Sequence, residues 1–124
     1  MSYRKTTDPV VKIRRCRDCR AVIAGFTERG LVTWCDVTPI TRQLEVIYHA
    51  GNRPTYLCQP RPGRTAWLDW RNPATATEPS RGIILVGHPH SSPDSGKAPE
   101  PPWLAVDYRI TLADPDEGQG AFPF

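Results

Sequence analysis

The chain lacks long apolar segments and is poor in apolar residues overall. Of its 124 residues, 39% are hydrophobic and 9% are aromatic. No segment approaches the run of roughly 18 apolar residues that crosses a bilayer as a helix, and no apolar signal-peptide core follows the basic residues near the N-terminus. We therefore expect a cytoplasmic protein without a membrane partner, whose four cysteines bind metal or stay free instead of forming disulfides.

Motifs of common active sites are also missing. The sequence contains no nucleophile elbow, no phosphate-binding glycine loop and no HExxH motif. The enzymatic alternative is an open metal site with Asp18, Asp36 or His49 as a base. We expect a protein that is not an enzyme.

Two cysteines two residues apart are the most informative feature that is present. Cys16 and Cys19 place both sulfurs on one side of a tight turn, which is typical of half of a tetrahedral Zn²⁺ site. His88 and His90 are the first candidates for the other half, because an extended backbone points residues two apart to the same side. Three residues remain open as alternative ligands: Cys35, His49 and Cys58.

Strand-like segments surround the cysteine pair. Residues 10–15 lead into it, and residues 21–27 and 31–37 form a hairpin through a turn at residues 28–30, as in a zinc ribbon. Further strands are predicted at residues 53–59, 65–71 and 82–88. The predicted fold class is α+β, a small zinc-ribbon-like antiparallel β domain with one helix and a C-terminal tethered strand.

The helix is predicted at residues 39–50. Thr38 is a suitable N-cap, Pro39 suits the first helical position, and Gly51 follows as the C-terminal capping residue. Helical spacing gives it one apolar face: Ile40, Leu44, Ile47 and Tyr48.

Proline divides the chain into predicted parts. The stretch at residues 91–102 is rich in proline and has almost nothing to bury, so we expect a linker there. It follows a domain at residues 1–90 and precedes a C-terminal strand and acidic tail at residues 103–124. A folded body of this size often needs a metal to supplement its apolar core.

At this point the chain resembles a group of small uncharacterised proteins from actinobacterial genomes and their phages or integrated elements. The likeness lies in the run from Cys16 to Trp34, in residues 36–39 (DVTP) and in residues 51–56 (GNRPTY). Members tend to begin with a Cys-x-x-Cys knuckle and to end the domain with His-x-Cys. The resemblance implies four ligands, with His90 where cysteine is usual and Arg20 where knuckles prefer glycine: Cys16, Cys19, His88 and His90.

Charge is unevenly distributed although the net formal charge is only +3. Residues 1–20 carry seven basic and two acidic residues, a net +5, whereas residues 94–124 carry two basic and six acidic residues, a net −4. A basic segment around a rigid turn suits phosphates or an acidic protein surface. We expect a non-catalytic binding module of a phage or mobile element that contacts nucleic acid or an acidic protein through its basic segment: Lys12, Arg14, Arg15, Arg17 and Arg20.

The alternative function uses the C-terminal segment. Residues 103–112 alternate between two faces, which predicts a strand that pairs in its own sheet, with a second copy or with a partner. In this hypothesis the protein is a host-protein inhibitor or a virion or assembly component. Its docking residues would be Trp103, Val106, Tyr108 and Ile110.

Overall fold

The computed structural model describes residues 9–61, 65–90, 93–94 and 97–105. Antiparallel strands joined in the order β3-β2-β1-β5-β4-β6 build one sheet, and a short seventh strand pairs with β1. The strands are β1 (Val10–Cys16), β2 (Val22–Glu28), β3 (Leu31–Asp36), β4 (Thr55–Arg61), β5 (Thr65–Trp70), β6 (Ile83–Val86) and β7 (Pro93–Asp94). With one α-helix among the described residues, α1 (Arg42–Ala50), the predicted α+β class is confirmed.

The hairpin of β2 and β3 forms as predicted. Its two turn residues, Arg29 and Gly30, have φ of 56° and 83°. Two consecutive residues with positive φ give the two-residue turn whose twist matches that of the flanking strands. The turn sets the register in which Glu28 faces Leu31 and Gly25 faces Trp34.

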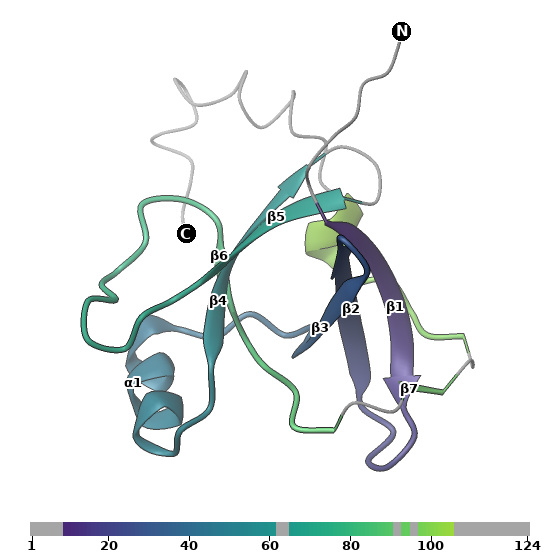
Figure 1. Cartoon of the computed structure of the whole chain (residues 1–124), viewed down its shortest axis with the longest axis horizontal. Coiled ribbons are helices and arrows are strands. Elements are labelled where there is room, and N and C mark those ends of the chain that lie inside the picture. The colour runs from purple at the N-terminus through teal and green to yellow at the C-terminus, as the bar shows by residue number, and fades with distance from the viewer. Residues whose placement is uncertain (1–8, 62–64, 91–92, 95–96, 106–124) are drawn as a thin grey trace, which may run out of the picture.

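The sheet consists of two three-stranded halves (Figure 1). The half of β1, β2 and β3 joins the half of β4, β5 and β6 through one pair at the start of β1, Val10 with Thr65. A bridge between Cys35 and Gly87 connects the other ends, and the His88 amide donates to the Trp34 carbonyl at 2.8 Å. The sheet therefore closes on itself at the corner where β6 ends.

The core lies between the two halves and includes a segment from the end of the described chain. Trp103 and Leu104 belong to the 3₁₀-helix η1 (Pro102–Ala105) and are buried there. The Trp103 ring stacks on Phe26 at 6.4 Å between centroids, and its indole N–H donates to the Val37 carbonyl at 2.8 Å. The buried cluster consists of Val11, Ile13, Ala24, Phe26, Cys35, Cys58, Ala66, Leu85, Trp103 and Leu104.

The predicted strand beginning at Trp103 is wrong over its first three residues, because these form η1. Its remaining residues lie outside the described ranges. The predicted linker carries β7, which pairs with the end of β1, and Ala98 packs against the core. The described residues of the predicted linker therefore pack against the sheet domain. No helix in the described part of the chain has the length and apolar character needed to span a bilayer.

The helix is present, but its start and its packing face differ from prediction. Ile40 pairs in extended conformation with Ile84, so the helix begins only at Arg42, and Thr41 is the N-cap through a 3.1 Å bond from the Leu44 amide. Two residues of the predicted apolar face point to solvent, with Leu44 38% and Ile47 65% exposed.

The end of the helix also differs in detail. Gly51 caps it with a φ of −94°, and Asn52 takes the left-handed conformation at φ 64°. The buried residue of the helix is Glu45, because tertiary ionic contacts outweigh the apolar pattern.

Candidate metal centre

The cysteine knuckle is a tight turn at the end of β1. The Cys16 amide donates to the Ala21 carbonyl at 2.8 Å, and the Arg20 amide donates to the Cys16 carbonyl at 2.9 Å. Arg20 has a φ of 65°, the conformation that glycine adopts without strain. The turn buries Cys16 completely and leaves Cys19 exposed.

The two histidines come from the segment that follows β6. The bridge at Gly87 and the hydrogen bond from the His88 amide fix this segment against β3. Cys16 Sγ lies 3.4 Å from His90 Nδ1, and Cys19 Sγ lies 3.5 Å from His88 Nε2. All four ligand atoms lie within 4.8 Å of one another. The predicted ligand set is thus brought together across 69 to 74 residues of sequence.

Two of the distances between ligand atoms match the edges of a tetrahedral site. Metal–sulfur bonds of about 2.3 Å and metal–nitrogen bonds of about 2.0 Å imply edges of roughly 3.3–3.8 Å between ligand atoms. The two sulfur–nitrogen distances fall inside that range. The four residues are therefore close enough to hold a metal ion.

A second layer of contacts orients His88. Its Nδ1 lies 2.5 Å from Asp36 Oδ1, so its Nε2 is left for the ion. Asp36 Oδ2 in turn lies 3.6 Å from the Arg53 guanidinium, which also donates to the Gly87 carbonyl at 2.7 Å. A carboxylate behind a ligating imidazole is a common arrangement in metal centres, where it fixes the tautomer and ring orientation.

The electrostatics favour the ionised ligand. Burial opposes ionisation of the Cys16 thiol, but hydrogen bonds from the backbone of Cys19 and Asp18 and from the two imidazoles lower its pKa to about 6. Burial would lower the pKa of His88, yet the hydrogen bond to Asp36 and the neighbouring Cys16 raise it. The thiolate is the form that binds metal, and the lowered pKa of Cys16 favours it. The raised pKa of His88 favours the imidazolium, which has to lose its proton to bind metal.

The three alternative ligands lie elsewhere. Cys35 and Cys58 are fully buried in the core, and burial raises the pKa of each thiol. His49 Nε2 lies 2.7 Å from the Thr55 hydroxyl. None of the three belongs to the metal cluster found among the described residues.

The basic residues are distributed over β1 and the knuckle. Lys12, Arg17 and Arg20 are exposed, whereas Arg14 and Arg15 are half-buried. The Arg15 guanidinium donates to the Arg20 carbonyl at 3.1 Å, so part of this charge supports the turn.

The residues predicted to dock a partner are not available as a group. Trp103 is 7% exposed and belongs to the core. Val106, Tyr108 and Ile110 lie outside the residues that the structure describes.

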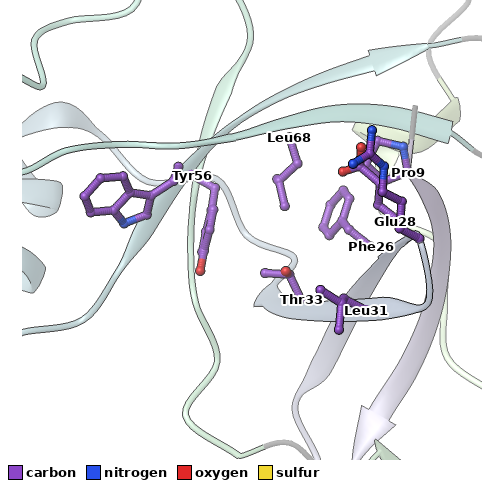
Figure 2. A pocket seen from close by; sticks show the side chains of 9 residues that line it. Pro9, Phe26, Glu28, Leu31, Thr33, Tyr56 and Leu68 are labelled. Atoms are coloured by element: carbon purple, nitrogen blue, oxygen red, sulfur yellow. The ribbon is translucent and has the colours of Figure 1, made fainter. Parts of the chain in front are cut away.

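Two of the hollows among the described residues lie beside the metal cluster and between the halves of the sheet. One, of about 670 Å³, runs from Cys19 and the histidines to Leu44 and Tyr48 of α1. The other, of about 360 Å³, opens between the two halves of the sheet. Figure 2 shows Tyr56 and Leu68 facing Phe26 and Thr33 across it.

A buried ion cluster behind α1 was not predicted from the sequence. Glu45 is fully buried and binds Arg71 through two bonds, Nε to Oε2 at 2.6 Å and Nη2 to Oε1 at 2.9 Å. Arg42 and the Thr55 hydroxyl donate to the same carboxylate at 3.1 and 2.5 Å. The local signal was the pair Glu45 and His49, spaced as helix neighbours four apart.

No protein-family model matches the chain, and no curated protein or solved structure shows significant similarity to it. The resemblance to actinobacterial and phage proteins stays a prediction.

Proposed function

We propose that Cys16, Cys19, His88 and His90 bind one Zn²⁺ and that the domain is a non-catalytic binding module held together by that ion. The observation that carries the proposal is the convergence of four soft and borderline ligand atoms within 4.8 Å of one another. Two thiolates and two imidazoles in a tetrahedron are a typical zinc set. Four protein ligands fill the coordination shell, so no position is left for a reactive water.

Metal analysis tests this assignment. The protein purified without added chelator should contain one zinc per chain, and Cys16→Ser should lose both the zinc and the folded state. Cys58→Ala is the matched control, because it removes an equally buried thiol that is not a ligand. Zinc at wild-type level in Cys16→Ser would refute the site.

The binding role rests on the basic segment. Lys12, Arg14, Arg15, Arg17 and Arg20 surround the start of the metal centre, and a knuckle fixed by an ion presents their charges on a rigid support. We propose that the partner is a polyanion in the cytoplasm, with nucleic acid as the first candidate and a phage or mobile element as the source of the protein. Contacts to phosphates fix position and make binding depend on salt.

A salt titration tests the binding role. The affinity for nucleic acid should fall steeply with salt. Joint neutralisation of Lys12, Arg14 and Arg17 to glutamine should reduce the log–log slope by about 0.7–0.9 for each phosphate that the variant no longer neutralises. Arg81→Gln is the control, since Arg81 is an exposed cation outside the basic segment, in the loop before β6. Equal slopes for the triple variant and the control would refute the role of the segment.

A protein partner is the second candidate function. Leu44, Val46 and Ile47 of α1 are 38 to 65% exposed, and the larger hollow lies beside Leu44. Capture of a nuclease-resistant partner that is lost in Ile47→Glu would support this candidate over nucleic acid.

A further inference from the structure

The outer face of β1, β2 and β3 presents three rows of residues. Directly paired residues of antiparallel strands point to the same face. Since Val11 and Phe26 point into the core, the neighbouring positions lie on the opposite face, where Ile23 is fully buried and Val10, Lys12 and Val32 are exposed. Counted from the start of β1 toward Cys16, the rows are Val10–Thr27–Val32, Lys12–Gly25–Trp34 and Arg14–Ile23–Asp36.

The middle row contains an indole lying against a glycine. A Cβ at Gly25 would lie 2.5 Å from Cζ3 and 2.6 Å from Cη2 of Trp34, so the six-membered ring rests directly on the Gly25 backbone. A glycine inside a strand weakens it and often marks a site of close approach. Here it lets the indole lie across the sheet toward β1, while Trp34 remains only half-buried.

Two cations occupy neighbouring positions on the same face. Lys12 is exposed in the same row, Arg14 is half-buried in the next, and neither forms an ion pair within the described ranges. The acidic residue of the three rows, Asp36, is already engaged by His88 and Arg53. Because Cys16 lies two residues beyond Arg14 on the same face, this face is continuous with the basic knuckle.

We infer that this face binds single-stranded nucleic acid, with an unpaired base stacked on Trp34 and phosphates against Lys12 and Arg14. The inference rests on the proposed function and specifies its ligand class. An aromatic platform beside cations suits a chain that carries both flat rings and negative charge. A duplex offers the same phosphates but keeps its bases stacked inside, so it can use the cations and not the indole.

Fluorescence anisotropy with four labelled probes tests the inference. The probes are oligothymidylate and oligouridylate of about 12 nucleotides, within the length range of single-strand sites, a DNA duplex of equal length, and polyglutamate as an acidic-protein analogue. We expect the two single strands to bind at least about tenfold more tightly than the duplex. Trp34→Leu should lower single-strand affinity about tenfold or more and leave duplex affinity unchanged. Trp34→Phe should retain most of the single-strand affinity. Trp70→Leu, which removes an exposed indole from β5, is the control.

A second measurement uses the wild-type protein, so its result does not depend on whether a variant folds correctly. In 5-fluorotryptophan-labelled wild-type protein, the resonance assigned to Trp34 through Trp34→Phe should shift on binding more than those of the other three tryptophans. Equal binding of single strand and duplex, with no shift at Trp34, would overturn the inference while leaving the basic segment as the binding site. Equal or tighter binding of polyglutamate would overturn the inference and assign the partner to proteins. Absence of binding to every nucleic-acid probe at low salt would overturn nucleic acid as the partner in the proposed function as well.

Discussion

The two halves of the sheet carry different groups on their outer sides. On β4 and β6 the outer side is packed against α1, and the contact is centred on the buried carboxylate of Glu45. On β1, β2 and β3 the outer side bears the metal centre at one end and the row of Lys12, Gly25 and Trp34 beyond it. One half therefore holds the helix through the ion pair of Glu45 with Arg71, a hydrogen bond from the Thr55 hydroxyl and contacts with β6. The other half brings together four side chains that lie close enough to hold a metal ion.

The comparison shows that two different kinds of interaction can connect distant parts of one small domain. The metal ligands connect residues 69 to 74 positions apart, and Glu45 connects α1 to Arg71, which lies 26 positions away. Loss of metal should unfold most of the chain, whereas loss of the carboxylate should weaken the second connection and leave the metal centre in place. The predictions below test this separation.

The largest effect should follow removal of the metal. Chelation, or Cys16→Ser, takes away the free energy of metal binding, which is also free energy of folding in small metal-stabilised domains. We expect a loss of about 5 kcal/mol or more, enough to unfold most of the chain. Circular dichroism melts with and without chelator measure it. A melt unchanged by chelator would show that the fold does not need the ion.

Glu45→Gln should have the next largest effect. It leaves the Arg71 guanidinium, whose side chain is 10% exposed, without its carboxylate. Removal of one partner of a buried ion pair costs about 3–5 kcal/mol. Urea denaturation should show this loss with zinc content unchanged. Glu78→Gln, at an exposed glutamate in the following loop, should be neutral. Loss of zinc in Glu45→Gln would contradict the independence of the two connections.

The stabilisation contributed by the Glu45 carboxylate should depend on pH. Burial would raise the pKa of Glu45, but hydrogen bonds from Arg71 and Thr55 and the charges of Arg71 and His49 lower it overall. A lowered folded-state pKa means that the ionised group stabilises the fold above its unfolded pKa of about 4.3, and that this stabilisation is lost as pH falls through the lower folded value.

The measurement is the stability difference between wild type and Glu45→Gln as a function of pH. It should be constant above about pH 5 and shrink below about pH 4.3. Zinc content is measured at each pH, and the comparison uses the pH range in which both proteins retain the metal. A difference that grew in acid would contradict the sign of the shift.

Asp36→Asn should weaken the metal centre without removing a ligand. The amide cannot hold the His88 imidazole as the carboxylate does at 2.5 Å. Loss of such a partner costs about 10- to 100-fold in metal affinity. Competition with a chromophoric chelator measures it, and Asp69→Asn on β5 is the control. Unchanged affinity would show that the hydrogen bond does not orient the ligand.

The smallest effect should come from the knuckle turn. Arg20→Gly relieves a left-handed residue and should raise stability by no more than about 1 kcal/mol. Arg17→Gly, in the same turn but without a positive φ, should lower stability by about 0.5–1 kcal/mol because glycine adds freedom to the unfolded chain. Thermal melts of the two variants measure the opposite changes in stability. The same sign in both would contradict the role of backbone conformation at residue 20.

Local signals predicted a large part of this arrangement. The hairpin of β2 and β3 followed from turn chemistry at Arg29 and Gly30. Spacing made His88 and His90 the first candidates to join Cys16 and Cys19, with Cys35, His49 and Cys58 left open, and the structure brings the first set together. The helix start could not be predicted, because it depends on the pairing of Ile40 with Ile84, over forty residues away in sequence.

The burial of Glu45 and Trp103 could not be predicted from local sequence signals either. Both depend on contacts with distant residues, Arg71 for the glutamate and Phe26 and Val37 for the tryptophan. Apolar periodicity alone assigned Leu44 and Ile47 to the core and Trp103 to a docking strand, and both assignments were wrong for this reason. Closure of the sheet at Gly87 likewise has no local sequence pattern.

The order of the ligands along the chain has a consequence for biosynthesis. Cys19 leaves the ribosome 69 residues before His88. At about 5–20 residues per second, translation needs roughly 3–14 s to cover that distance. During this interval the nascent polypeptide exposes a pair of thiols that no imidazole can yet join. Under the proposed zinc assignment, capture of the ion is therefore a late event of synthesis, and oxidants or competing metals have their best access to the cysteines before it.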